Sequence, residues 1–416
     1  MRVPTSFRCL LTLLALAVLA LPCPAQDSGR RRPVPELNST DRSRLAQLRA
    51  GSQAVSGDND IALLKTAAQF YVNRLTEAKY HRKSTLTDHH LGMHDLVAEA
   101  KQAMPLPERE MSDNQQQFMK DFTKALLVEI KEVLHNPEPI AQVNAAQILA
   151  HLGKLGQDDA LDLMVEIIDP AKPYSDVVRI WALHGLEDLF ERVRPRPPAR
   201  EQRAIQALLD FVNQSPKLTG KEPRDVVNAF RYFRRQAIRA LGRTRVPGDT
   251  GGKPPTALVL LRFMRKDGFK PEPSVSEQVE AAIGACQLHS KLYSDYQPDY
   301  TVHQVGEFIV DFVDAYARDL TRTDPEHPAS EGWKYHAARL IKALEALRID
   351  TRERDKHVLE VTEKAMNLLK QVSTGSTTVE GGNFRRWLDK NPPTEATSVY
   401  KDVPGSVVKP PESSDK

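Results

Sequence analysis

The chain has 416 residues, of which 40% are hydrophobic, 27% charged and only 6% aromatic, with a formal net charge of +3. This composition is typical of a soluble helical protein. The only long apolar run in the sequence is at the N-terminus, so a body of several membrane-spanning helices is excluded. The interspersed charges give no global argument for binding nucleic acid or an anionic membrane.

The first 25 residues have the pattern of a signal peptide. Arg2 and Arg8 are positively charged, residues 10–21 are almost wholly apolar, and small residues precede a cleavage position after Ala25. The apolar run is shorter than the roughly 20 residues that span a bilayer comfortably. We therefore expect export to a periplasmic or secreted location with no membrane span after cleavage. An uncleaved N-terminal membrane anchor is the alternative.

Signal cleavage changes the cysteine and charge inventories. Of the three cysteines only Cys286 remains, so an intrachain disulfide is impossible and stability must come from packing. Cys286 lies on the apolar face of a predicted helix, where a buried thiol is expected. Removing Arg2 and Arg8 leaves 56 basic against 55 acidic residues, a formal charge of +1. No cofactor is predicted.

Residues 26–57 are polar, include Arg30, Arg31 and Arg32, and are predicted to form a flexible linker. Residues 58–136 form a predicted N-terminal helical region. Its first helix carries one apolar stripe at helical spacing, made of Ile61, Leu64, Ala68, Tyr71 and Leu75. Two further helices are expected at residues 90–103 and 115–134.

A repeated helical pattern occupies residues 137–372. Its copies align on a small anchor residue, spaced 36 to 55 residues apart, at Ala146, Ala182, Ala237, Ala282 and Ala337. Another small or apolar residue follows three positions later in each copy. Small residues at this spacing let two helices approach closely, so this face should meet a neighbouring helix.

A second amphipathic helix follows each anchor helix. The five predicted segments are residues 158–168, 200–212, 256–265, 302–320 and 356–372. A two-helix unit cannot bury its own apolar face alone, so five such units should stack on one another.

The anchor helices resemble the HEAT-repeat family, including its short bacterial type with Val-Arg-x-x-Ala-x-x-Ala-Leu-Gly in the first helix. Val178, Arg179, Ala182 and Leu186 match in one copy. A fuller match is made by Arg234, Ala237, Ala240, Leu241 and Gly242. The resemblance implies an all-α, right-handed, armadillo-like α-solenoid that holds other macromolecules. It brings no catalytic residues.

Residues 373–416 are rich in Ser, Thr, Gly and Pro and are predicted to be a disordered tail. An aromatic island at residues 384–388 interrupts them. This island could cap the last repeat or serve as a docking motif, and capping is favoured because terminal repeats need covering.

The best metal-like pattern is the pair His90 and His94. One helical turn separates them, so both imidazoles could reach one ion. No third ligand is specified and no glutamate lies between them, which favours an exposed helix start capped by Thr87 or Asp88. A metal-binding protein or metal-dependent enzyme centred on this pair is the alternative function.

The candidate partner-binding residues are four arginines spaced four apart, at Arg231, Arg235, Arg239 and Arg243. Like charges at this spacing repel, so acidic groups should lie near them. The favoured partners are internal, from Glu187, Asp188 and Glu191 of the preceding copy. The alternative is a bound acidic protein segment or polyanion.

These observations predict an exported, non-enzymatic scaffold that binds another protein along a HEAT-like solenoid surface. The rival hypotheses are the metal site at His90 and His94 and an anionic polymer bound by the arginines.

Overall fold

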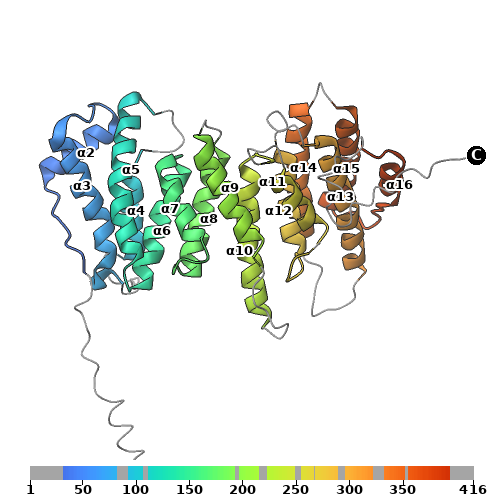
Figure 1. Ribbon diagram of the computed structural model, residues 1–416, viewed down its shortest axis with the longest axis horizontal. Coiled ribbons are helices and arrows are strands. Elements are labelled where there is room, and N and C mark those ends of the chain that lie inside the picture. The colour runs from blue at the N-terminus through green and yellow to red at the C-terminus, as the bar shows by residue number, and fades with distance from the viewer. Residues whose placement is uncertain are drawn as a thin grey trace, which may run out of the picture.

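The computed structural model describes residues 31–81, 92–105, 111–192, 196–214, 223–248, 254–266, 268–288, 296–321, 332–351 and 355–393. These residues form fifteen α-helices and three short 3-10 helices and contain no strand. The fold class is therefore all-α, as predicted. The helices stand side by side in a row that runs from the N-terminal to the C-terminal end of the chain (Figure 1).

The N-terminal part contains four α-helices and two 3-10 turns. Their bounds are α2 (Ser39–Ala50), α3 (Gly57–Asn73), η1 (Arg74–Thr76), η2 (Ala78–Tyr80), α4 (Met93–Gln102) and α5 (Asp113–Leu134). Helix α5 packs against α2, α3 and α6, so this part continues directly into the rest of the molecule.

The repeated part contributes two parallel sets of helices. The first row contains α6 (Pro139–Lys154), α8 (Asp176–Glu191), α10 (Arg224–Arg243), α12 (Val275–Gln287) and α14 (Gly332–Thr351). The second row contains α7 (Leu161–Ile168) with its leading turn η3 (Asp158–Ala160), α9 (Pro198–Val212), α11 (Pro255–Met264), α13 (Pro298–Leu320) and α15 (Lys356–Thr374). Each helix contacts the next member of its own row, and second-row helices also pack against first-row helices. The five predicted second helices are confirmed to within a few residues.

Several of these helices begin at residues that favour a helix N-terminus. Proline occupies the first turn of α6, α9, α11 and α13, at Pro139, Pro198, Pro255 and Pro298. Proline suits this position because its missing N–H has no helical acceptor there. Helices α5 and α12 instead begin with a serine capping box.

The anchor alanines lie where the repeat pattern predicts them. Ala146, Ala182, Ala237, Ala282 and Ala337 are all fully buried. Glycines bring some first-row helices still closer: a methyl group on Gly153 would lie 2.3 Å from the carbonyl oxygen of Gly185, and one on Gly242 would lie 2.6 Å from the Cα of Gly284. Small side chains therefore set the separation of the first-row helices.

The segment predicted as a flexible linker is largely structured from residue 31 onward. Arg31 pairs with Glu77 at 2.6 Å and Arg32 pairs with Glu129 at 3.1 Å. Helix α2 follows and buries Leu48 against the core. The linker prediction fails here because the carboxylates that hold the two arginines lie 46 and 97 positions away in the chain.

The C-terminal boundary also differs from the prediction. Helix α15 extends to Thr374, and α16 (Gly382–Lys390) lies within the segment predicted to be disordered. Helix α16 packs on α13 and α15 with Phe384 and Leu388 buried. Arg385 pairs with Asp311 of α13 at 2.5 Å. The aromatic island thus covers the end of the helical row, as expected of a cap.

The predicted signal peptide and residues 394–416 lie outside the described residues. Among the described helices, none is both long enough and apolar enough to cross a bilayer.

Candidate interaction surface

The four arginines of the predicted stripe all lie on α10, and the structure gives them different surroundings. Arg231 donates to the backbone oxygen of Glu272 at 2.9 Å. Arg243 pairs with Glu191 of α8 at 3.7 Å. Arg239 is held by carboxylates on both neighbouring helices, whereas Arg235 forms no ion pair within the described part of the chain. The stripe is thus not one uniform basic surface.

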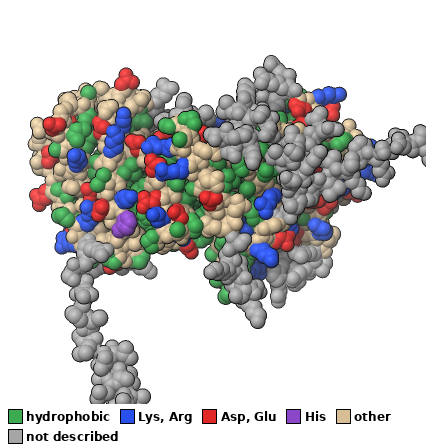
Figure 2. All heavy atoms as spheres, viewed as in Figure 1, with side chains coloured by type: hydrophobic (Ala, Val, Ile, Leu, Met, Phe, Trp, Pro, Cys, Tyr) green, Lys and Arg blue, Asp and Glu red, His purple; other side chains and the backbone are tan. Residues whose placement is uncertain are grey.

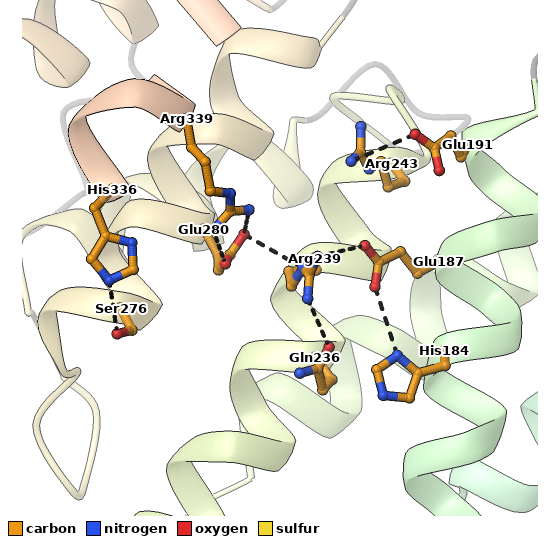
Figure 3. Close-up of polar contacts among 10 residues, drawn as sticks. All are labelled: His184, Glu187, Glu191, Gln236, Arg239, Arg243, Ser276, Glu280, His336 and Arg339. Carbon is orange, nitrogen blue, oxygen red and sulfur yellow. Dashed lines mark hydrogen bonds and ion pairs between the residues drawn. The ribbon is translucent and has the colours of Figure 1, made fainter. Parts of the chain in front are cut away.

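Arg239 is the centre of a charged network that crosses four first-row helices (Figure 3). Its guanidinium lies 3.1 Å from Glu187 of α8 and 3.6 Å from Glu280 of α12. Glu280 also receives two hydrogen bonds of 2.6 Å from Arg339 of α14. His184 lies 4.0 Å from Glu187 at the other end. We call His184, Glu187, Arg239, Glu280 and Arg339 the Arg239 network.

The Arg239 network is close to electrically balanced. Burial raises the pKa of Glu187, and the charges of Arg239 and Arg243 oppose that rise. Burial and the nearby arginine charge lower the pKa of His184, so this imidazole is mostly neutral at pH 7. Two carboxylates then face two guanidinium groups. The internal acidic partners expected for the stripe are therefore found for Arg239 and Arg243.

Aromatic side chains lie beside the arginines on the same helices. The Arg235 guanidinium lies 5.1 Å from the ring centre of Tyr232, and that of Arg339 lies 5.4 Å from the ring centre of Tyr335. Tyr232 is 37% exposed and Tyr335 is 62% exposed. Trp181 of α8 contacts the His184 ring. We call Trp181, Tyr232, Arg235, Tyr335 and Arg339 the aromatic–arginine face.

His336 of α14 connects this face to α12. Its Nε2 lies 3.2 Å from the Ser276 hydroxyl. Burial lowers the pKa of His336, and the charges of Arg339 and Arg235 lower it further. The His336 ring also lies beside the Tyr335 ring, with 5.6 Å between the ring centres.

The sequence pattern missed Glu280, Arg339 and both tyrosines. A signal was present, because Arg239 and Arg339 each come two residues after the anchor alanine of their copy, at Ala237 and Ala337. Equivalent positions in stacked repeats face the same side. Applying the register of the clearest copy to every other copy would have found Arg339.

The metal candidates are not assembled into a site in the described part of the chain. His90 lies outside the described residues, and the His94 side chain is 97% exposed with Asp95 at 3.9 Å. No group of three or more metal-ligating side chains occurs among the described residues. Cys286 is buried, and burial raises its thiol pKa to about 12. The Cys286 thiol has the environment predicted for it.

Elsewhere the visible surface mixes the two charge signs. In Figure 2 the basic and acidic side chains over α2 to α9 alternate without forming a large patch of one sign.

No family model, curated protein or solved structure matches the chain.

Proposed function

We propose that this protein is an exported, non-enzymatic scaffold whose helical pairs stack as a HEAT-like, right-handed α-solenoid and bind another protein. The aromatic–arginine face is the proposed contact surface. The observation that carries the proposal is the exposure of Tyr232 and Tyr335, each stacked with an arginine, around the balanced Arg239 network.

The chemistry of the aromatic–arginine face favours a protein partner. Tyrosine, tryptophan and arginine are the residues most often responsible for binding energy at protein interfaces. The cation–π contacts orient Tyr232 and Tyr335 before a partner arrives, which reduces the entropy lost on binding. The Arg239 network ties α8, α10, α12 and α14 together beneath them. The face is therefore both exposed and rigid.

The partner segment should be apolar or aromatic with a single carboxylate, rather than a polyanion. Arg239 and Arg243 are already paired with glutamates, so they offer little charge to a polymer. Within the described part of the chain neither Arg231 nor Arg235 forms an ion pair, and because Arg231 already donates to a backbone oxygen, Arg235 is the more available to an external carboxylate. The salt dependence of binding should accordingly be shallow, whereas polyanion binding weakens steeply with each counterion released.

The experiment uses the mature chain as an affinity bait in the exported fraction of its source cells. The test variants are Arg235→Ala and Tyr335→Ala, and the control is Val226→Ala, an exposed side chain elsewhere on α10. We expect one protein to copurify with the wild type and the control, and at least tenfold less with either test variant.

Thermal unfolding of each variant shows that the fold is intact. A partner that binds both test variants as well as it binds the wild type would refute the proposed face. Failure to recover any protein after gentle crosslinking would refute the scaffold function itself.

A further inference from the structure

A second surface feature lies over α5 of the N-terminal part and over α7 and α9 of the second row. A groove of about 910 Å³ crosses α5, α7 and α9. Its apolar lining includes Leu127, Val128, Leu163, Val165 and Ala207. Val128 is 61% exposed and also borders a hollow of about 300 Å³ between α3 and α5.

The groove follows one face of α7, because Asp162, Glu166 and Asp169 line it from the first turn of the helix to its C-cap. Helix α7 has eight residues, whereas α5 has 22 and α9 has 15. At 1.5 Å per residue, α7 is about 12 Å long, so the groove has room for a short segment of another chain beside it. On α5 and α9, Val128 is the exposed apolar side chain of the lining, whereas Leu127 and Ala207 are half-buried. Such a hollow is comparable in size to a ligand-binding cleft.

Most charges around the groove are paired with one another. Lys131 contacts Glu166 at 2.9 Å, and Arg203 contacts Asp162 at 2.7 Å. The hydrogen bond from Lys131 is the main cause of the lowered pKa of Glu166, and the charge of Lys172 adds to it. The basic side chains of the rim therefore already act on these carboxylates.

Asp169 and Asp210 are the rim carboxylates that contact no basic group within the described part of the chain. Asp169 accepts only the backbone N–H of Ala171, at 2.9 Å, and Asp210 accepts only the Gln206 amide, at 2.8 Å. Both lie at the C-terminal ends of their helices, α7 and α9. A helix C-terminus carries partial negative charge, so a carboxylate there is unfavourable unless a cation approaches.

We propose that this groove binds a segment of another polypeptide with a Lys or Arg next to a large apolar side chain. The cation lies between Asp169 and Asp210, and the apolar side chain covers Val128 and Leu163. The charge complementarity points to a basic segment, because five carboxylates and three basic side chains line the groove, so its net charge is negative. This site is on a different row of helices from the aromatic–arginine face and does not depend on it.

The test selects peptides from a phage-displayed library of random sequences on the full mature chain. Selected peptides are then titrated against purified variants by fluorescence anisotropy. The test variant is Asp169→Asn with Asp210→Asn, which keeps one acceptor oxygen in each side chain but removes both charges. The matched control is Glu132→Gln, an exposed carboxylate on α5 outside the groove. A second test variant, Val128→Arg, places a large, positively charged side chain in the apolar lining of the groove.

We expect peptides that combine Lys or Arg with an apolar residue. They should bind the wild type, Glu132→Gln and Arg235→Ala equally, and at least tenfold more weakly to the double aspartate variant and to Val128→Arg. Acidic or unrelated peptides, or equal binding to all variants, would overturn the proposal. A dimer of the free chain that Val128→Arg dissociates would overturn it in favour of self-association. Because Arg235→Ala is included, failure here is distinguishable from failure of the aromatic–arginine face.

Discussion

Replacing Arg234 with methionine should destabilise the protein more than any comparable change on the arginine stripe. Arg234 is 1% exposed and is one of the largest fully buried side chains among the described residues. Its Nε lies 2.6 Å from Glu277 of α12, which is also fully buried, and its Nη2 donates to the backbone oxygen of Pro271 at 2.9 Å. The guanidinium also lies 5.2 Å from the ring centre of Phe263.

The magnitude follows from the partner that the change leaves behind. Methionine has a similar volume and remains compatible with the surrounding phenylalanine rings, so the cavity term is small. Glu277 however loses its counterion inside the core, and breaking a buried pair in this way costs about 3–5 kcal/mol. The other oxygen of Glu277 accepts from Ser274 in the capping box of α12. The loss should therefore also loosen the start of that helix.

The assay is urea unfolding followed by far-UV circular dichroism, with Arg231→Met as the control. Arg231 is half-buried and, within the described part of the chain, its side chain bonds only to a backbone oxygen outside its helix. Its replacement leaves no buried carboxylate without a partner and should cost less than about 1 kcal/mol. In a double-mutant cycle with Glu277→Leu, we expect a coupling of at least about 2 kcal/mol because no charge is stranded in the double variant. A loss below about 1 kcal/mol for Arg234→Met, or additive effects in the cycle, would refute this reasoning.

Two further predictions concern packing and pH. Gly242→Ala should lower the free energy of unfolding by about 1–3 kcal/mol in the same assay, because the added methyl group would lie 2.6 Å from Gly284. The control Gly382→Ala adds a methyl group that meets nothing within 4 Å and should be neutral. Equal effects of the two changes would contradict the close contact. Burial and two nearby lysines lower the pKa of His151 from 6.5 to about 4, so between these pH values the unfolded chain takes up a proton that the folded chain does not. The free energy of unfolding should therefore fall by about 1–2 kcal/mol as the pH drops from 6.5 to 4, after allowance for partial solvent screening. His151→Gln should weaken this pH dependence when thermal unfolding is measured at several pH values. An unchanged dependence would contradict the role given to His151.

The sequence predicted the positions of the helices well. The anchor alanines and the amphipathic stripes repeat at helical spacing, and this periodicity comes from neighbours only three or four residues apart. Helices α9, α11, α13 and α15 accordingly begin and end within a few residues of the predicted bounds. The burial of every anchor alanine follows from the same local pattern.

The segments around the core were harder to predict. Polar composition suggested disorder before residue 57 and after residue 372, yet α2 and α16 are helical. Each is held by contacts with distant elements, through Leu48 in α2 and through Phe384 and Arg385 in α16. Composition averages over a segment and does not show which few side chains find a distant partner.

What the sequence determined by itself is the all-α class, the order of the helices and the face that each buries, because these depend on short-range spacing. Only the tertiary structure decided which charges meet. It placed Arg234 in the core and Arg239 between two glutamates, and it left Arg235 on the surface, although all three belong to one helix. It also placed Gly242 against Gly284, and it left a groove along α7 between α5 and α9. These outcomes depend on the rotation and separation of neighbouring helices, which bring together residues about 40 to 60 positions apart.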